Sequence, residues 1–440
     1  MAALQNIVWL LVLIGVMILI HELGHFWAAR YFDVKVDVFS FGFGPRIFGF
    51  KRGDTDYRLS AILFGGYVKM SGEQPGEEAS DDPRGFLRKP RWQRLIIAAA
   101  GPFMNILLSI GLLTGMFMVK YQKVVETGGA VIGHVAKDSA AAKAGIQDGD
   151  KIVRLEGKSD PTWDDIIREE IASAGKPLAV TVERAGKQIP VLVTPILDEK
   201  IGVGIAGWEE QSEILVGNVS PNMPAKNAGL RKGDLLLSIN GVPIRSRYTL
   251  QEVIKKTEGN PVSIDYLRNG QRQTVSLAPV FSKSDPKPRW MIGVEMELKL
   301  NVITTRLAFL PALEESVVQN RKSASLIYAF LRGMLERRMS AKSLEGPIGI
   351  AQRSGEAARE GPAAFLLLMT VVSLNLAIFN LLPIPILDGG VILLLLIEMI
   401  MRRDVSLQVK EGMLKVGFVF LMAIVVFVLY NDISKILPQG

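Results

Sequence analysis

The sequence predicts a polytopic α-helical membrane protein of about four spans, with a small membrane-associated β region and two copies of a small α+β domain between the second and third spans. Three observations support this fold class. Several apolar stretches are long enough to cross a bilayer. A long polar segment, from about residue 127 to residue 300, separates the second stretch from the third. Within that segment a glycine-rich pattern occurs twice, which indicates an internal repeat.

The composition agrees with a mixture of membrane spans and soluble domains. Of the 440 residues, 49% are hydrophobic, and the mean hydropathy of +0.26 is high for a soluble protein but low for one wholly in lipid. The net charge of +7 is best explained by Lys and Arg beside the spans. We expect no nucleic-acid partner, because no basic stripe with interleaved aromatic residues is present. The absence of cysteine excludes disulfides, thiolate metal ligands and a cysteine nucleophile.

The first span, within residues 1–30, ends in the pattern HELGH at residues 21–25. Residues four apart share one face of a helix, so His21 and His25 can bind one metal ion. Neutral imidazoles suit zinc, and Glu22 is placed to take a proton from a zinc-bound water. Ionisable groups at membrane depth are costly, which favours a functional site. The alternative is a juxtamembrane helix with two solvated histidines.

Residues 31–94 predict a β-hairpin region associated with the cytoplasmic side of the membrane. Four short strands are expected, and turns rich in Gly and Pro separate them. An exposed edge of the last strand could accept an extended peptide as an added strand, and its paired glycines permit close backbone approach. An ordinary hairpin is the alternative. The residues of this candidate binding strand are Gly65, Gly66, Tyr67, Val68, Lys69 and Met70.

The second span, residues 95–122, follows a cluster of basic residues that places the preceding region in the cytoplasm. This span contains the pattern GPFMN at residues 101–105. Proline loosens a helix and glycine permits close packing. Asn105 is a polar group inside the span that needs a partner. It could bond to a substrate backbone or to a neighbouring helix.

The polar segment after the second span is a tandem repeat. The pattern AGIQDGDKI at residues 144–152 recurs as AGLRKGDLL at residues 228–236, so equivalent positions differ by 84 in the numbering (234 − 150). Repeats of this length are two copies of one domain, which we place at residues 123–208 and 209–300. Because they follow the second span, both domains are expected outside the cytoplasm.

The repeated pattern resembles that of PDZ domains. The stretches at residues 201–204 (IGVG) and 292–294 (IGV) end the two copies and resemble the PDZ peptide-binding loop, here placed last. That order resembles the circularly permuted PDZ form of bacterial proteases. Such domains bind extended peptide ends by strand addition and backbone capture of a carboxylate. Two spacers that bind nothing are the alternative. His134 lies in the first copy, and we expect it to be structural rather than a metal ligand.

The C-terminal third returns to the membrane. Residues 301–362 predict amphipathic surface helices and a linker, because their apolar residues have helical spacing but are mixed with too many charges to span. Packing on the second repeat domain is the alternative. The third span and a short following helix occupy residues 363–403, and the fourth span and the C-terminal tail occupy residues 404–440.

The third span ends in NLLPIPILDGG at residues 380–390. Prolines and glycines there interrupt the helix at membrane depth, which is tolerated only where protein or a cavity satisfies the backbone. Asp388 is a carboxylate in an apolar stretch and needs a cation, while zinc held by His21 and His25 needs a third ligand. Pairing them gives a site with two histidines, one aspartate and an open fourth position for water. The alternative is that Asp388 caps the following helix.

The pattern HELGH together with the later N-x-x-P-x-P-x-L-D-G resembles the site-2 protease family of intramembrane zinc metalloproteases. The likeness extends to Gly101, Pro102 and Asn105, to the strand at residues 65–70 and to the tandem PDZ-like domains. The resemblance implies one Zn²⁺ ion bound by His21, His25 and Asp388, with Glu22 as the general base. It also implies that Asn380 contacts the substrate backbone and that the strand at residues 65–70 holds the unwound substrate.

The resemblance further implies regulated cleavage of single-pass transmembrane substrates, such as anti-sigma factors, with the PDZ-like domains as a size filter. The expected location is the bacterial inner membrane, in contact with lipid. The PDZ-like domains, with any peptide ligands, and both termini would be periplasmic, and the active site would lie near the cytoplasmic side. One rival is a non-catalytic membrane scaffold with a structural metal. Another is a metal transporter, which would need more intramembrane ligands along a path.

Overall fold

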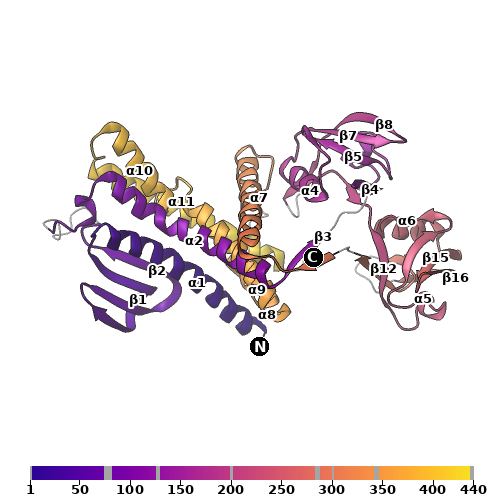
Figure 1. Ribbon diagram of the computed structural model, residues 1–440, viewed down its shortest axis with the longest axis horizontal. Coiled ribbons are helices and arrows are strands. Elements are labelled where there is room, and N and C mark those ends of the chain that lie inside the picture. The colour runs from indigo at the N-terminus through magenta and orange to yellow at the C-terminus, as the bar shows by residue number, and fades with distance from the viewer. Residues whose placement is uncertain are drawn as a thin grey trace. The chain divides into compact units, whose positions relative to one another are not determined.

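Figure 1 shows the computed structural model, in which the chain forms two compact units. The first unit comprises residues 1–121, 305–328 and 342–440, and the second comprises residues 122–304 and 329–341. The structure describes residues 2–73, 82–124, 129–198, 202–282, 288–299, 302–340 and 346–436. The second unit therefore holds the polar segment with the repeat, and the first holds the apolar stretches.

Among the residues that the structure describes, four helices are long and apolar enough to cross a membrane. Many of their Leu, Val and Phe side chains are exposed, as expected where lipid rather than protein covers an apolar surface. Helix α2 is central, because it packs against α1, α9 and the shorter α10. The four candidate spans are α1 (Ala2–Tyr31), α2 (Arg91–Val119), α9 (Pro362–Asn380) and α11 (Leu407–Ile436).

The β region is one long, bent hairpin of β1 (Val36–Arg52) and β2 (Thr55–Met70). The residues Val38–Phe41 pair with Asp56–Leu59 on one side and with Gly66–Lys69 on the other. The two strands therefore act as four segments, which correspond to the four short strands expected from the sequence. The segment from Gly66 to Met70 is terminal, and within the described residues no strand pairs with its outer edge.

A small apolar core fixes this hairpin on the helices. Ala29 of α1 and Ile97 of α2 are fully buried, and Val36 and Met70 of the hairpin pack into the same cluster. Phe86, in the short 3-10 helix η2 (Phe86–Arg88), completes it. The outer edge of the terminal segment is thereby held close to α1.

The second unit contains two domains with the same strand order. The core of each lies between its sheet and one helix, and Ile166 of α4 and Leu250 of α6 are equivalent buried residues (250 − 166 = 84). The first domain has the order β11 (Trp208–Glu210), β4 (Ala130–Val135), β5 (Lys151–Leu155), β7 (Leu178–Arg184), β8 (Lys187–Val193), with α3 (Ala140–Lys143) and α4 (Trp163–Ala172). The second has β19 (Val294–Lys299), β12 (Glu213–Val219), β13 (Leu235–Ile239), β15 (Val262–Arg268), β16 (Gln271–Leu277), with α5 (Pro224–Asn227) and α6 (Arg247–Thr257).

The repeated Gly-Asp pair has a structural reason. The buried carboxylate of Asp150 accepts hydrogen bonds from the backbone N–H of Gln147 and from the Arg184 guanidinium, at 2.8 and 2.7 Å. Asp234 makes the same two contacts in the second domain. Burial alone would raise the pKa of Asp150, but these hydrogen bonds hold it below its usual value. The pattern is therefore explained by folding and does not itself identify a binding site.

The structure corrects the expected position of the first peptide-binding loop. In the second domain, the carbonyls of Ile292 and Gly293 accept hydrogen bonds from Ala225 and Ser220. In the first domain the corresponding acceptors are Ala206 and Gly207, which bond to Ala141 and Ala136. The loop equivalent to residues 292–294 is therefore residues 206–208 and not residues 201–204. Strand β11 also carries the first domain to Glu210, two residues beyond the expected boundary.

The remaining elements connect or extend these parts. In α7, the first half packs against α2 through Thr114 with Ser316, 2.9 Å apart, and Ser109 with Asn320, 2.5 Å apart. The expected location of this amphipathic segment on the membrane surface stays a prediction. The elements not yet given bounds are β3 (Tyr121–Val124), β6 (Lys158–Ser159), β9 (Ile196–Asp198), β10 (Val203–Ile205), β14 (Val242–Pro243), β17 (Val280–Ser282), β18 (Arg289–Met291), β20 (Val302–Thr305), α7 (Phe309–Leu335), α8 (Pro347–Glu360) and α10 (Asp388–Met401).

Candidate active site

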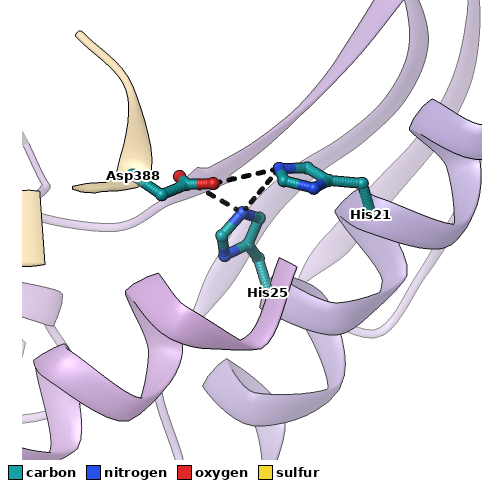
Figure 2. Close-up of side chains that lie close together, drawn as sticks. All are labelled: His21, His25 and Asp388. Atoms are coloured by element: carbon teal, nitrogen blue, oxygen red, sulfur yellow. Dashed lines mark hydrogen bonds and ion pairs between the residues drawn. The ribbon is translucent and has the colours of Figure 1, made fainter. Parts of the chain in front are cut away.

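Three side chains from two distant segments meet in the first unit (Figure 2). His21 and His25 project from α1, one helical turn apart, and Asp388 is the first residue of α10. The Nε2 atoms of the two histidines are 3.3 Å apart. Asp388 Oδ2 lies 3.1 Å from His21 Nε2, and Oδ1 lies 3.5 Å from His25 Nε2. Both histidines are buried, at 7% and 8% exposure.

The geometry of these atoms fits a zinc ion. With metal–ligand bonds of about 2.0–2.1 Å, two ligand atoms of a tetrahedral zinc lie about 3.3 Å apart. The three separations given above scatter around that value. Asp388 Oδ2 is also a buried atom without a hydrogen-bond partner, which a cation would compensate. The donor set of two imidazoles and one carboxylate leaves one position of a tetrahedron for water.

Helix α2 supports both imidazoles from behind. His25 Nδ1 donates a hydrogen bond to the carbonyl oxygen of Ile97, at 2.8 Å, which directs its Nε2 toward Asp388. His21 Nδ1 lies 3.3 Å from the side-chain amide of Asn105. Such outer partners fix the tautomer and orientation of a metal-binding histidine. Of the two roles open for Asn105, the structure thus places its side chain against a neighbouring helix.

Two glycines allow the helices to approach closely at this point. A Cβ atom added to Gly101 would occupy the space of His25 Nε2 and lie 2.8 Å from His21 Nε2. A Cβ atom on Gly24 would collide with the carbonyl oxygen of Ala100 on α2. The glycine of the GPFMN pattern therefore clears the volume in which the three candidate ligands meet.

The loop before Asp388 is tight and strained. Ile386 has φ +91°, a conformation that is costly for a β-branched residue. A Cβ atom on Gly389 or Gly390 would collide with the carbonyls of Leu382 and Ile384, respectively. The N-cap of α10 is Leu387 and it makes no side-chain capping bond. Asp388 instead directs its carboxylate at the histidines, so the alternative of a helix cap is not what the structure shows.

Glu22 lies between the candidate ligands and the β hairpin. Its carboxylate accepts a hydrogen bond from the backbone N–H of Val68, and a Cβ atom on Gly66 would lie 3.3 Å from Glu22 Cγ. The N–H of Met70 also points outward, to Glu73 Oε2 at 3.3 Å. Alternate residues of a strand direct their N–H groups to the same edge. The outer edge of the segment from Gly66 to Met70 therefore faces Glu22.

Two other residues that were considered from the sequence have no hydrogen bond or ion pair with this cluster in the described part of the chain. Asn380 ends α9 eight residues before Asp388 (388 − 380), and in the described part of the chain its side chain makes no hydrogen bond. His134 belongs to the second unit, where its Nδ1 lies 3.8 Å from Asp148 Oδ2. Among the described residues, His21, His25 and Asp388 form the one group of three or more that could hold a metal ion.

Two structural contributions were not predicted from the sequence: the backbone carbonyl that orients His25 and the buried charge cluster around Glu398. The carbonyl of Ile97 orients His25, but a backbone atom leaves no signal in the residue pattern. Glu398 of α10 is fully buried, pairs with Lys410 Nζ at 2.7 Å and lies 4.0 Å from the Arg94 guanidinium. This carboxylate was detectable, because an acidic residue inside an apolar helix requires a partner.

The chain is similar to known proteins over nearly its whole length. Residues 9–424 match peptidase family M50. A putative zinc metalloprotease of Vibrio cholerae is 29% identical over 459 residues, which cover 98% of this chain and 99% of that protein. The regulator of sigma-E protease RseP of Escherichia coli is 30% identical over 447 residues, which cover 97% and 98%. A solved PDZ domain of an SdrC-like protein from Listeria monocytogenes aligns with 20% of this chain and 90% of that one, at 21% identity and a TM-score of 0.18.

The fold and the comparisons define a multi-pass membrane zinc metalloprotease. The chain belongs to peptidase family M50, the site-2 proteases, and the family covers nearly its whole length. The expected resemblance to this family and the expected enzyme class are confirmed, and the relatives include proteins named RseP.

Proposed function

We propose that this protein cuts single-pass transmembrane substrates within the membrane, using one zinc ion bound by His21, His25 and Asp388. The observation that carries the proposal is the meeting of segments from opposite ends of the chain at a single point, with ligand atoms within 4.8 Å of one another. A non-catalytic scaffold would not need an open metal position beside a partly buried carboxylate such as Glu22. A transporter would need a series of such sites.

The residues around the cluster divide the chemistry among them. When bound, zinc supplies a Lewis acid that lowers the pKa of a coordinated water toward ~7. Glu22 is the general base: its carboxylate takes the proton of the attacking water and can pass it to the leaving amine. His21 and His25 present Nε2 to the metal, because their Nδ1 atoms face Asn105 and the Ile97 carbonyl. We assign Asn105 this positioning role in place of substrate binding.

The edge from Gly65 to Met70 supplies the substrate site. A peptide bond in a transmembrane helix is shielded by the hydrogen bonds of its own helix, so the substrate must unwind before attack. Strand addition replaces the lost bonds. The N–H groups of Gly66, Val68 and Met70 line the edge that faces Glu22, which would present the added strand to the base. Asn380, at the end of α9, is assigned to contact the substrate backbone near the bond that is cut.

The biological setting follows from the relatives and the span order. The related E. coli protein is named regulator of sigma-E protease, which supports a membrane-anchored substrate of the anti-sigma-factor type. We place the enzyme in the bacterial inner membrane, with the repeat domains and both termini in the periplasm and the metal near the cytoplasmic side. The repeat domains would exclude substrates that still carry a bulky outer domain.

Three variants test the assignment side by side. Glu22→Gln should retain zinc but cut a model transmembrane peptide at least about 100-fold more slowly. Asp388→Ala should lose both zinc and cleavage. Gly66→Pro should retain zinc but cut the same peptide more slowly, because proline removes one N–H from the edge. Normal cleavage by Glu22→Gln would refute the base, and normal zinc content of Asp388→Ala would remove that residue from the ligand set. Wild-type cleavage by Gly66→Pro would count against strand addition.

A further inference from the structure

The fourth candidate span, α11, touches the rest of the first unit at few points. Over residues 408–434, whose burial the structure describes, the buried residues are Gly417, Asn431 and Asp432. The chain neighbours of Gly417, Val416 and Phe418, are 69% and 56% exposed. Glycine in a helix interior costs about 1 kcal/mol relative to alanine, so a glycine that is buried on an otherwise exposed helix is explained by what it contacts.

Gly417 lies against the loop that leads to Asp388. A Cβ atom added to Gly417 would lie 2.4 Å from the carbonyl oxygen of Pro385 and 2.6 Å from the Pro385 Cβ atom. Non-bonded heavy atoms pack at about 3.5–4.0 Å, so even one methyl group would force the helix and the loop apart by about 1 Å. Pro385 precedes Asp388 by three residues (388 − 385). The glycine therefore lets the backbone of α11 reach the segment that carries a candidate metal ligand.

The contact also covers a backbone carbonyl that the loop itself leaves unpaired. The carbonyls of Leu382, Ile384 and Leu387 accept backbone N–H groups at 2.7, 3.1 and 2.9 Å. In the described part of the chain, no N–H or O–H group donates a hydrogen bond to the Pro385 carbonyl. At membrane depth such an oxygen has no water to bind. Cα–H groups at close helix contacts are weak donors to carbonyls, and Gly417 brings its Cα to this oxygen.

Helix α11 is anchored on both sides of this contact. Toward its N-terminus, Lys410 Nζ lies 2.7 Å from the buried carboxylate of Glu398 on α10. Toward its C-terminus, the Asp432 carboxylate accepts three backbone hydrogen bonds at the start of α8, at 2.9, 3.0 and 3.1 Å. A side chain at position 417 would have to bend the anchored helix or displace the loop. The loop contains the strained residue Ile386, so we expect the loop to move.

We propose that Gly417 is a positioning residue for the metal site: by receiving the Pro385 carbonyl, α11 holds the Asp388 carboxylate beside His21 and His25. A displacement of about 1 Å is about half the length of a metal–oxygen bond of about 2.0–2.2 Å. A carboxylate displaced by that distance no longer binds an ion that the two histidines hold. The role of Gly417 rests on the proposed ligand set, because it requires Asp388 to bind the ion.

Gly412 provides a matched control on the same helix, because a Cβ atom added there meets nothing within 4 Å. Competition with a chelator measures the zinc Kd of the full-length protein in detergent. Gly417→Ala should raise that Kd by about tenfold or more, and Gly417→Leu should raise it further. Gly412→Ala and Gly412→Leu should match wild type. The visible absorption spectrum of the Co²⁺-loaded protein is the second readout, and it should change in the Gly417 variants alone, because Asp388 is displaced.

The thermal midpoint of the metal-free protein separates positioning from folding. It should be similar in Gly417→Ala and Gly412→Ala, and if Gly417→Leu does not fold, Gly417→Ala alone decides. A zinc Kd and a Co²⁺ spectrum of Gly417→Ala equal to those of Gly412→Ala would overturn the proposal. A large fall in the metal-free midpoint of Gly417→Ala would also overturn it, by assigning the glycine to folding. Normal zinc content of Asp388→Ala would instead overturn the proposed ligand set, whereas loss of zinc there with an unaffected Gly417→Ala would overturn only the role of Gly417.

Discussion

Replacing Asn105 with leucine should weaken zinc binding by about 10- to 100-fold while the membrane helices stay folded. Asn105 is completely buried on α2, and leucine is apolar and large enough to fill the site, so the change removes a polar partner without creating a cavity. The side chain that loses its partner is His21, whose Nδ1 lies 3.3 Å from the Asn105 amide.

The size of the effect follows from the position of one proton. When Nε2 of His21 binds a metal, the ring proton must sit on Nδ1 and needs an acceptor. Asn105 Oδ1 is buried without a partner, and exchanging the amide oxygen and nitrogen by a flip of the side chain would direct it at Nδ1. A buried N–H without an acceptor costs about 1–3 kcal/mol. Without metal the proton can sit on Nε2, 3.1 Å from Asp388 Oδ2, so the cost falls on the zinc-bound state.

The assay is competition for zinc between the purified protein and a chelator of known affinity. Asn105→Asp retains an acceptor and should stay within a few-fold of wild type. Ser373→Ala is the matched control, since Ser373 Oγ bonds at 2.9 Å to the backbone carbonyl of Asn105 and not to its side chain. A zinc Kd for Asn105→Leu within twofold of wild type would show that the amide does not orient His21.

Three further outcomes are expected. Gly101→Ala places a methyl group on His25 Nε2, so it should abolish zinc binding, measured by metal analysis, while the far-ultraviolet circular dichroism spectrum keeps its helical signal. Asp150→Asn should destabilise the first repeat domain by about 2 kcal/mol at pH 7. The pKa of Asp150 is lowered in the folded domain, so its contribution is present above pH ~3.8 and lost as the pH falls below that value; the difference between variant and wild type in denaturant unfolding should therefore shrink in acid. Lys410→Met leaves the buried Glu398 without its closest cation and should lower the thermal midpoint of the first unit, whereas Lys410→Arg should preserve most of it.

The sequence revealed the candidate ligands because each motif carries its chemistry locally. The spacing of His21 and His25 needs only a helix to place both rings on one face, and Asp388 stands out as an acid in an apolar stretch. The contacts that orient the rings could not be found in this way. The partner of Asn105 depends on how α1 crosses α2, which is set by the close approach of Gly24 to Ala100 rather than by any pattern along the chain.

The position of the first peptide-binding loop was predicted wrongly because the spacing between equivalent residues of the two copies changes along the repeat. The difference in numbering between equivalent positions stays at 84 from Asp150 and Asp234 as far as β9 and β17. Beyond them the difference becomes 86, as β10 and β18 show, because the second copy is longer by two in the connection. The letters Ile-Gly-Val of residues 292–294 recur at residues 201–203, so the sequence pattern placed the first loop at residues 201–204 instead of residues 206–208. Only the backbone hydrogen bonds of Gly207 and Gly293 reveal the true equivalence.

Helix α2 explains why two motifs from opposite ends of the chain meet at one point. On one side it meets α1 at Gly24, so closely that no side chain would fit between the backbones. Near its N-terminus Arg94 lies beside Glu398 of α10, and Lys410 of α11 completes that buried charge cluster. Breaking a buried pair is far more costly than breaking an exposed one, so α10 is anchored to α2 at the end away from Asp388. Because α1 and α10 both pack on α2, Asp388 and the two histidines are held on neighbouring helices, and the strained residue Ile386 lies two positions before Asp388.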